Sequence, residues 1–240
     1  MATVILVRHG RTTANSAGVL AGRAAGVRLD ELGATQAAAA GERLAGVPLV
    51  RLVSSPLERC RQTAAAIAAA QAERPRVLSE RGITECDYGD WQGRALKELA
   101  KEKLWKAVQS QPSAVEFPGG ETMRGMQERG VAAVRRHDAA AEAEHGPGAV
   151  WVAVSHGDVI KAILADALGT HLDSFQRIVV DPCSVSVVRY TATRPIVMRS
   201  NDSGGDLAPL VPQPAGRRRR GRSTGTPMPS SDAVVGGGAG

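Results

Sequence analysis

The stretch "VILVRHGRTTAN", residues 4–15, joins a short apolar run to several polar side chains. Its first four residues form a continuous apolar run, which is typical of a strand buried on both faces in a parallel sheet. The run stops at Arg8, His9 and Gly10. Two readings are open at this point: the chain surfaces into a loop, or the strand presents a cation and an imidazole to an anion.

Several other stretches repeat the strand pattern. Residues 49–53 and 150–154 are β-branched and almost continuously apolar, and residues 75–79 and 183–190 are further strand candidates. The last predicted helix begins with Asp158, a good N-cap residue. The alternation of strands and helices predicts an α/β protein with a mostly parallel sheet and right-handed crossovers. The helical segments that lie between the strands cover residues 33–46, 56–71, 95–109, 121–144 and 158–169.

A second strand ends in the same way as the first. The segment "VWVAVSHGDVI", residues 150–160, reaches Ser155, His156 and Gly157 and then enters a helix. In an open α/β sheet, ligands bind at the edge formed by the carboxyl ends of the strands. A lone His at a strand end is more often structural, but two His-Gly pairs after two apolar strands favour a site that contains His9 and His156.

Two more segments add polar groups to this edge. Strand 49–53 leads into a helix that carries Arg59 in its first turn, and the stretch 78–93 supplies Glu85. Arg forks bind phosphate oxygens in bidentate fashion. A neutral imidazole can attack phosphorus, and a carboxylic acid can protonate a leaving alkoxide. No cluster has metal-ligand spacing, so the Arg side chains would supply the charge that metal ions supply in kinases.

Four segments carry a resemblance to a known family. The stretches "RHGRTTAN", "SSPLERCRQTA", "ECDYGDWQG" and "SHGDVI" resemble the motifs of the histidine phosphatase superfamily and occur in the family's order. They lie within residues 3–190. The resemblance implies a phosphoglycerate-mutase-like fold, which is an α/β three-layer sandwich with a mostly parallel central sheet flanked by helices.

The resemblance also implies a role for individual residues. By it, His9 is the nucleophile that becomes phosphorylated, and Glu85 is the proton donor. His156 has an independent chemical reason to be there, because it can donate to a phosphoryl oxygen as charge develops. Because no cluster has metal-ligand spacing, we expect neither a metal nor a cofactor. The side chains that would bind the phosphate are Arg8, Asn15, Arg59 and His156.

Two features depart from the common family pattern. Many members have Glu or Gln where this chain has Arg11, and two readings of Arg11 stay open: it widens the positive mouth of the site, or it points to solvent. The interval of 71 residues between Glu85 and His156 is shorter than in the cofactor-dependent mutases and resembles the phosphatase branch. Residues 116–122 resemble the family segment that opens the helix over the site.

The leading prediction is a phosphomonoesterase that acts on a small phosphorylated metabolite through a phosphohistidine. The alternative enzyme is a cofactor-dependent phosphoglycerate mutase, against which the short interval argues modestly. An alternative of another class is a catalytically inactive phosphate-binding module, although every expected catalytic residue is present. A nucleic-acid-binding role would rest on the run "RRRRGR" at 217–222 alone.

Composition divides the chain into two parts. Residues 1–200 hold the catalytic domain, and from Asn201 onward Gly, Pro, Ser and Arg dominate. Such a composition buries no core, so residues 201–240 are predicted to be a disordered tail. We favour a solvated basic run at 217–222 over a site for nucleic acid.

Charge and cysteine usage indicate the compartment and the partners. The formal net charge of +6 suits a small phosphorylated substrate as well as a nucleic acid. Cys60, Cys86 and Cys183 have unrelated spacings, which predicts reduced thiols. No apolar run reaches the length of a membrane span and no signal segment follows Met1, so we expect a cytoplasmic protein that binds no membrane. Because dimers are common in the family, the resemblance adds a homodimer to these expectations.

Overall fold

Within residues 2–205, which the computed structural model describes, six strands form one sheet in the order β3–β2–β4–β1–β5–β6. The pairs β1–β4, β2–β4 and β2–β3 are parallel, whereas β5 and β6 add to one edge in antiparallel fashion. The predicted α/β class with a mostly parallel sheet is therefore confirmed. The strands are β1 (Thr3–Arg8), β2 (Leu49–Ser54), β3 (Val77–Ser79), β4 (Val150–Ser155), β5 (Val185–Tyr190) and β6 (Pro195–Asp202).

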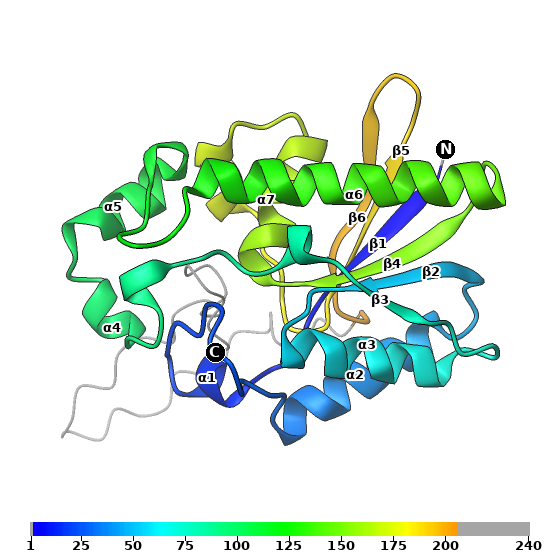
Figure 1. Cartoon of the computed structure of the whole chain (residues 1–240), viewed down its shortest axis with the longest axis horizontal. Helices are drawn as coiled ribbons and strands as arrows, with labels where there is room; N and C mark the ends of the chain where they lie inside the picture. Colours follow the sequence, from blue (N-terminus) through cyan, green and yellow to red (C-terminus); the bar gives the residue numbers. More distant parts are fainter. Residues whose placement is uncertain (1, 206–240) are drawn as a thin grey trace, which may run out of the picture.

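Helices cover both faces of this sheet (Figure 1). α2 (Glu31–Leu44) and α3 (Glu58–Ala70) lie on one face, and α6 (Met123–His145) and α7 (Gly157–Ala167) lie on the other. This arrangement is the three-layer sandwich that the sequence predicted. Shorter elements connect the layers: α1 (Thr13–Ser16), η1 (Arg81–Ile83), η2 (Gly89–Trp91), α4 (Leu96–Leu99), α5 (Lys103–Ser110), η3 (Pro112–Ala114) and η4 (Leu172–Arg177).

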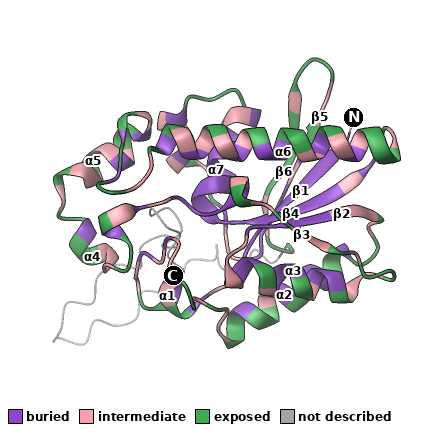
Figure 2. Cartoon of the chain, in the orientation of Figure 1, coloured by how far each residue is buried: buried purple, intermediate pink, exposed green. Residues whose placement is uncertain are grey.

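Strand β1 lies inside the sheet, and all of its residues are buried (Figure 2). Because side chains alternate along a strand, Val4 and Leu6 pack in the cluster that includes α6 and α7. Ile5 and Val7 pack in the opposite cluster with α3. This two-sided burial is the physical reason why the run is apolar at every position.

The helix predicted over residues 95–109 is two helices. α4 ends at Leu99, and α5 begins at Lys103 after a turn. Leu99 is fully buried, and the Trp105 ring stacks on Trp91 with ring centroids 6.1 Å apart. The turn allows the apolar side of each short helix to reach the core. In the sequence, these two apolar sides resemble the single stripe of one longer helix.

Helix α7 begins immediately after β4, so its N-cap is His156 rather than Asp158. The His156 carbonyl accepts the amide of Ile160 at 3.0 Å, as the first carbonyl of a helix does. Asp158 lies inside the first turn, is fully buried, and accepts a hydrogen bond from the Tyr88 hydroxyl at 2.7 Å. The predicted N-cap was wrong because the side chain of Asp158 is used across the core and not on its own backbone.

Strand β6 was not predicted, and it crosses the predicted domain boundary at residue 200. It ends at Asp202, and most of its side chains are partly or fully exposed. As an edge strand it pairs with β5 alone, and its apolar run covers only residues 196–198 before polar side chains follow. Asn201 fixes its end by accepting the Asp181 amide on its side-chain oxygen at 2.6 Å. The first two residues of the predicted tail, Asn201 and Asp202, therefore belong to β6.

The remainder of the predicted tail, residues 206–240, lies outside the described residues, and so does the basic run at 217–222. Within the described part, no helix has the length and apolar character needed to cross a membrane. Cys60, Cys86 and Cys183 are free and buried, which confirms the predicted unpaired thiols.

Candidate active site

Three parallel strands bring the predicted residues to one edge of the sheet. Arg8 at the end of β1 pairs in register with Ser155 of β4. The His9 amide donates a hydrogen bond to the Ser155 carbonyl at 3.0 Å. The rings of His9 and His156 consequently lie edge to face, with centroids 5.2 Å apart. Arg8 and His9 are only 1% and 4% exposed, so the chain does not surface where the apolar run stops. The prediction that the two His residues neighbour each other is confirmed.

Gly10 is required because another backbone lies against it. A Cβ at this position would collide with the carbonyl oxygen of Gly33 in the first turn of α2. The Gly10 amide also donates to the Thr63 hydroxyl of α3 at 3.1 Å. The turn after His9 is thus clamped between both helices of that layer, which fixes the direction of the imidazole.

The imidazole of His9 is held as a neutral base. Its Nδ1 donates to the Gly10 carbonyl at 2.8 Å, which leaves the lone pair on Nε2. Burial, followed by the charges of Arg59 and Arg8, holds the pKa of His9 well below its usual value. Neutral His9 therefore presents a nucleophilic nitrogen, Nε2, toward Arg59.

Arg59 lies at the centre of the site and is 2% exposed. Its Nη2 donates to the Gly22 carbonyl at 2.7 Å, and its Nε lies 3.2 Å from Nε2 of His9. Its Nη1 is buried and has no hydrogen-bond partner among the described residues. A buried cationic donor without a partner is costly, and an anionic oxygen would satisfy it.

Arg8 adds a second buried cation to the same edge. Its Nη1 donates to the Val180 carbonyl at 2.8 Å. Its backbone carbonyl accepts the amide of Cys183 at 3.1 Å, so the segment before β5 holds it from two directions. Two guanidinium groups beside one neutral imidazole form an environment suited to a phosphate.

His156 bridges Arg59 and a serine that the sequence reasoning did not assign. Its Nδ1 lies 3.2 Å from Nη2 of Arg59, which can only donate, so Nε2 carries the proton. That proton points to the Ser55 hydroxyl at 2.8 Å. Burial, followed by the charges of Arg59 and His9, lowers the pKa of His156 well below its usual value. The signal for Ser55 was available, because it directly follows β2 at the same edge.

Glu85 completes the constellation from the loop after η1. It is 3% exposed, its Oε1 accepts the Cys86 amide at 2.9 Å, and its Oε2 lies 3.8 Å from Nδ1 of His156. Burial, followed by the charge of Asp158, raises the pKa of Glu85 to about 7, against the opposing effect of Arg59. The carboxyl group can therefore donate a proton near neutral pH.

Asn15 and Arg11 lie close to this edge in sequence and have structural contacts. The side-chain oxygen of Asn15 accepts the amide and the hydroxyl of Thr12 at 3.0 and 2.7 Å, which closes a capping box at α1. Its predicted contact with phosphate stays a prediction. Arg11 forms an ion pair with Asp30 at 2.7 Å, an arrangement that neither reading of Arg11 anticipated.

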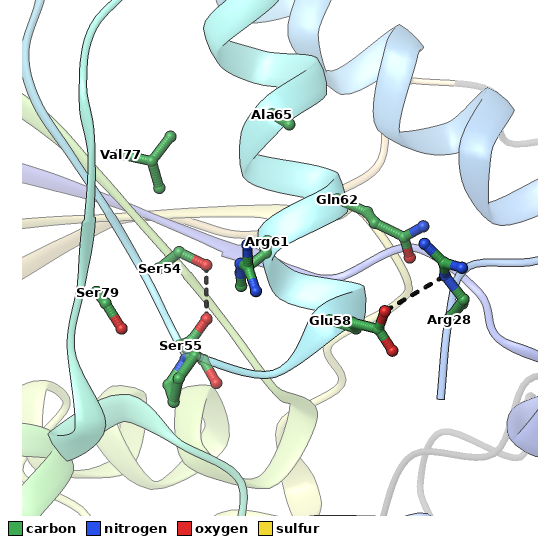
Figure 3. Close-up of a pocket in the computed structure, with 10 residues that line it drawn as sticks. Arg28, Ser54, Ser55, Glu58, Arg61, Gln62, Ala65, Val77 and Ser79 are labelled. Carbon is green, nitrogen blue, oxygen red and sulfur yellow. Dashed lines mark hydrogen bonds and ion pairs between the residues drawn. The ribbon is translucent and has the colours of Figure 1, made fainter. Parts of the chain in front are cut away.

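A separate pocket opens beside the carboxyl end of β2 (Figure 3). Its volume is about 660 Å³, and neither His9 nor Glu85 is among the described residues that line it. Ser55 forms part of its wall and also contacts His156, so the pocket adjoins the site. The charged and hydroxyl side chains that line it include Arg28, Ser54, Ser55, Glu58, Arg61 and Ser79.

Across residues 2–205, no group of three or more His, Cys, Asp or Glu side chains is arranged to hold a metal ion. The positive charge at the site comes from Arg8 and Arg59. What the arrangement can do is bind an anion, attack it with an imidazole and supply a proton from a carboxyl group.

Comparisons with known proteins agree with this geometry. The sequence profile described as "Histidine phosphatase superfamily (branch 1)" matches residues 4–203. Phosphoserine phosphatase 1 of Hydrogenobacter thermophilus is 30% identical over 203 residues, which cover 84% of this chain and 92% of that protein. The probable phosphoglycerate mutase GpmB of Proteus mirabilis is 32% identical over 193 residues, which cover 79% of this chain and 86% of that protein.

A solved structure extends the likeness to three dimensions. The mycobacterial glucosyl-3-phosphoglycerate phosphatase, solved in complex with VO3, superposes with a TM-score of 0.75 at 25% sequence identity. The match covers 83% of this chain and 98% of that one. The resemblance noted from the four motifs is therefore confirmed over the whole catalytic unit.

Proposed function

The chain belongs to the histidine phosphatase superfamily, and we propose that it is a phosphomonoesterase that acts through a phosphohistidine at His9. The observation that carries the proposal is the position of Arg59, which contacts both His9 and His156 and keeps one buried donor, Nη1, without a hydrogen-bond partner within residues 2–205. A phosphate placed there would meet the nucleophile and its charge partners together.

In the first step, Nε2 of His9 attacks phosphorus, and the N–P bond forms as the ester P–O bond breaks. Arg8 and Arg59 neutralise the charge on the equatorial oxygens. The leaving oxygen needs a proton as the bond breaks, and the carboxyl group of Glu85 supplies it. Free-base His9 and protonated Glu85 are the forms favoured by the pKa values of these two buried groups.

In the second step, water attacks the phosphohistidine. The Glu85 carboxylate takes a proton from that water, the new P–O bond forms, and the N–P bond to His9 breaks. Inorganic phosphate leaves, and both residues return to their starting protonation states. Arg8 and Arg59 bind the phosphoryl oxygens in both steps. His156 donates from Nε2 to Ser55 and accepts Nη2 of Arg59 on Nδ1, so it holds that guanidinium group in place, and its predicted contact with phosphate stays a prediction.

We propose that catalysis needs neither a metal nor an organic cofactor, because Arg8 and Arg59 provide the charge at the phosphate. The same proposal places the enzyme in the cytoplasm, which agrees with its three free cysteines. The homodimer suggested by the family stays a prediction.

The substrate proposed is a small phosphorylated metabolite. One relative is named a phosphoserine phosphatase and a structural neighbour is named a glucosyl-3-phosphoglycerate phosphatase. Another relative is named a probable phosphoglycerate mutase, so mutase activity is the alternative proposal.

The deciding experiment is a substrate panel in which phosphate release and 3-phosphoglycerate isomerisation are read side by side. The panel includes phosphoserine, 3-phosphoglycerate, fructose 2,6-bisphosphate and 4-nitrophenyl phosphate. Phosphate release without isomerisation supports the phosphatase, and fast isomerisation with little release supports the mutase. A protein that binds phosphate esters but turns none over would be an inactive binding module.

A further inference from the structure

The backbone around Glu85 is held by a guanidinium group that the mechanism does not use. Arg129, on α6, donates from Nη1 to the carbonyls of Gly82 and Thr84 at 2.8 and 2.7 Å. Its Nη2 lies 3.1 Å from the carbonyl of Glu85 itself. One side chain therefore binds three carbonyls in the loop that carries the proton donor.

A second arginine, which precedes Glu85 in the chain, binds the same carbonyl. Arg23 donates from Nε to the Glu85 carbonyl at 2.9 Å, and its Nη1 forms an ion pair with Asp87 at 3.2 Å. Arg23 directly follows Gly22, whose carbonyl accepts a hydrogen bond from Arg59. The loop that carries Arg23 thus contacts both the phosphate-binding arginine and the proton donor.

Glu121 joins the two arginines. Its Oε1 accepts Nη2 of Arg129 at 2.6 Å, Nη2 of Arg23 at 3.0 Å and the Asp87 amide at 2.8 Å. Its Oε2 accepts Nε of Arg129 at 2.9 Å, so the ion pair with Arg129 is bidentate. Burial opposes ionisation of Glu121, but the hydrogen bonds from Arg129 and the Asp87 amide outweigh it and lower its pKa. The network is therefore charged and internally satisfied.

We propose that Arg129, Glu121 and Arg23 are positioning residues for the proton donor Glu85, an inference that rests on the proposed phosphatase function. Their contacts fix the Glu85 carbonyl, and the Cys86 amide fixes Oε1. Oε2 is then directed toward His156, at 3.8 Å from its Nδ1. A misplacement of about 1 Å at a catalytic group can cost roughly 100-fold in rate, so a firm backbone matters for proton transfer.

The test replaces Arg129 by Lys, which keeps the charge and removes the fork that binds the three carbonyls. Arg135→Lys is the matched control, because Arg135 also lies on α6 and forms an ion pair with the exposed side of α7, at Asp166. Phosphorylation of the enzyme is followed in single turnovers with the best alkyl phosphate of the panel and with 4-nitrophenyl phosphate.

We expect Arg129→Lys to lower the phosphorylation rate with the alkyl substrate by about 10-fold or more, because part of the rate enhancement from the general acid is lost. The rate with the nitrophenyl substrate should fall by less than about threefold, because its leaving group needs little protonation. In a Glu85→Gln background the same change should give no further loss on the alkyl substrate, because the group it positions is gone. Arg135→Lys should leave both rates unchanged.

Equal losses on both substrates, or a full further loss in the Glu85→Gln background, would overturn the positioning role. If thermal unfolding shows that Arg129→Lys is not folded, the same two substrates are compared with Glu121→Gln. Label on His9 is measured in the same samples. A wild-type enzyme that turns over without labelled His9 would sink the proposed function itself, whereas labelled His9 with equal losses would sink only the positioning inference.

Discussion

Nε of Arg59 lies 3.2 Å from Nε2 of His9, and Nη2 of the same guanidinium lies 3.2 Å from Nδ1 of His156. One buried cation therefore faces the lone pairs of both imidazoles. Because the Arg59 side chain is delocalised and planar, it can hold both contacts in one geometry and still direct its Nη1 elsewhere.

The first prediction follows from this fork. Arg59→Lys keeps the charge but replaces the planar donors by a single ammonium, so it should weaken phosphate binding. Hydrogen bonds to charged groups contribute about 1.5–3 kcal/mol each, so kcat/KM should fall by roughly 10- to 100-fold. Arg61→Lys is the control. Arg61 lies on the same helix as Arg59, is exposed, and lines the neighbouring pocket. Similar losses in both variants would mean that the Arg59 fork has no special role.

The second prediction concerns the leaving group. A phosphorylated alcohol leaves as a basic alkoxide, whereas 4-nitrophenyl phosphate leaves as a stabilised anion. Glu85→Gln should slow the alkyl substrate by about 10²–10⁴-fold and the nitrophenyl substrate far less. Single-turnover kinetics of the phosphorylation step give the comparison directly, since a slow second step would hide it. Equal losses would show that Glu85 serves binding or structure.

The third prediction is the pH dependence of that step. Glu85 must be protonated to donate, and its pKa is raised to about 7. The single-turnover rate on an alkyl phosphate should therefore fall as the pH rises through about 7. His9 has a lowered pKa and stays neutral, so no loss from its protonation is expected at mildly acidic pH. A rate on the alkyl substrate that does not change between pH 6 and 8, or the same alkaline loss in Glu85→Gln, would contradict the assignment.

The fourth prediction uses the end of β6. Asn201 binds Asp181, next to Val180, whose carbonyl accepts Arg8. A chain that ends at Ser200 should lose both stability and phosphate affinity, whereas one that ends at Gly205 keeps these contacts. In a domain of this size each kcal/mol lost lowers Tm by about 2–4 °C, so thermal unfolding can resolve the difference. Equal Tm values for the two truncated chains would show that the end of β6 supports nothing.

The chemistry at this edge could be predicted because it lies where strands end. His9, Ser55 and His156 each come directly after the last residue of a strand, and parallel strands place their carboxyl ends together. Arg59 lies in the first turn of the helix that follows β2, within reach of the same edge.

Other features had no signal in a single sequence. Arg129 shares a polar helix with Arg135 and Arg136, and only the folded chain brings Arg129 to the carbonyls around Glu85. Asp158 and its hydrogen-bond partner Tyr88 are likewise 70 residues apart in sequence. β6 escaped prediction because its apolar run is only three residues long, at 196–198. As an edge strand it leaves two of them, Ile196 and Met198, exposed.

The fifth prediction concerns the source of positive charge. In the proposed function Arg8 and Arg59 neutralise the charge of the phosphate, so EDTA should leave the rate nearly unchanged. Vanadate should inhibit, because it mimics pentacoordinate phosphorus and transition-state mimics bind tightly. A strong loss in EDTA that magnesium restores would contradict the proposed metal independence.

The proposed chemistry requires a covalent phosphohistidine at His9, and this intermediate can be trapped. Brief incubation with substrate labelled in its phosphate, followed by a denaturing quench, should give acid-labile, base-stable label on the peptide that contains His9. His9→Ala should carry no label and show no turnover. Full activity in His9→Ala, or label on another residue, would rule out His9 as the nucleophile.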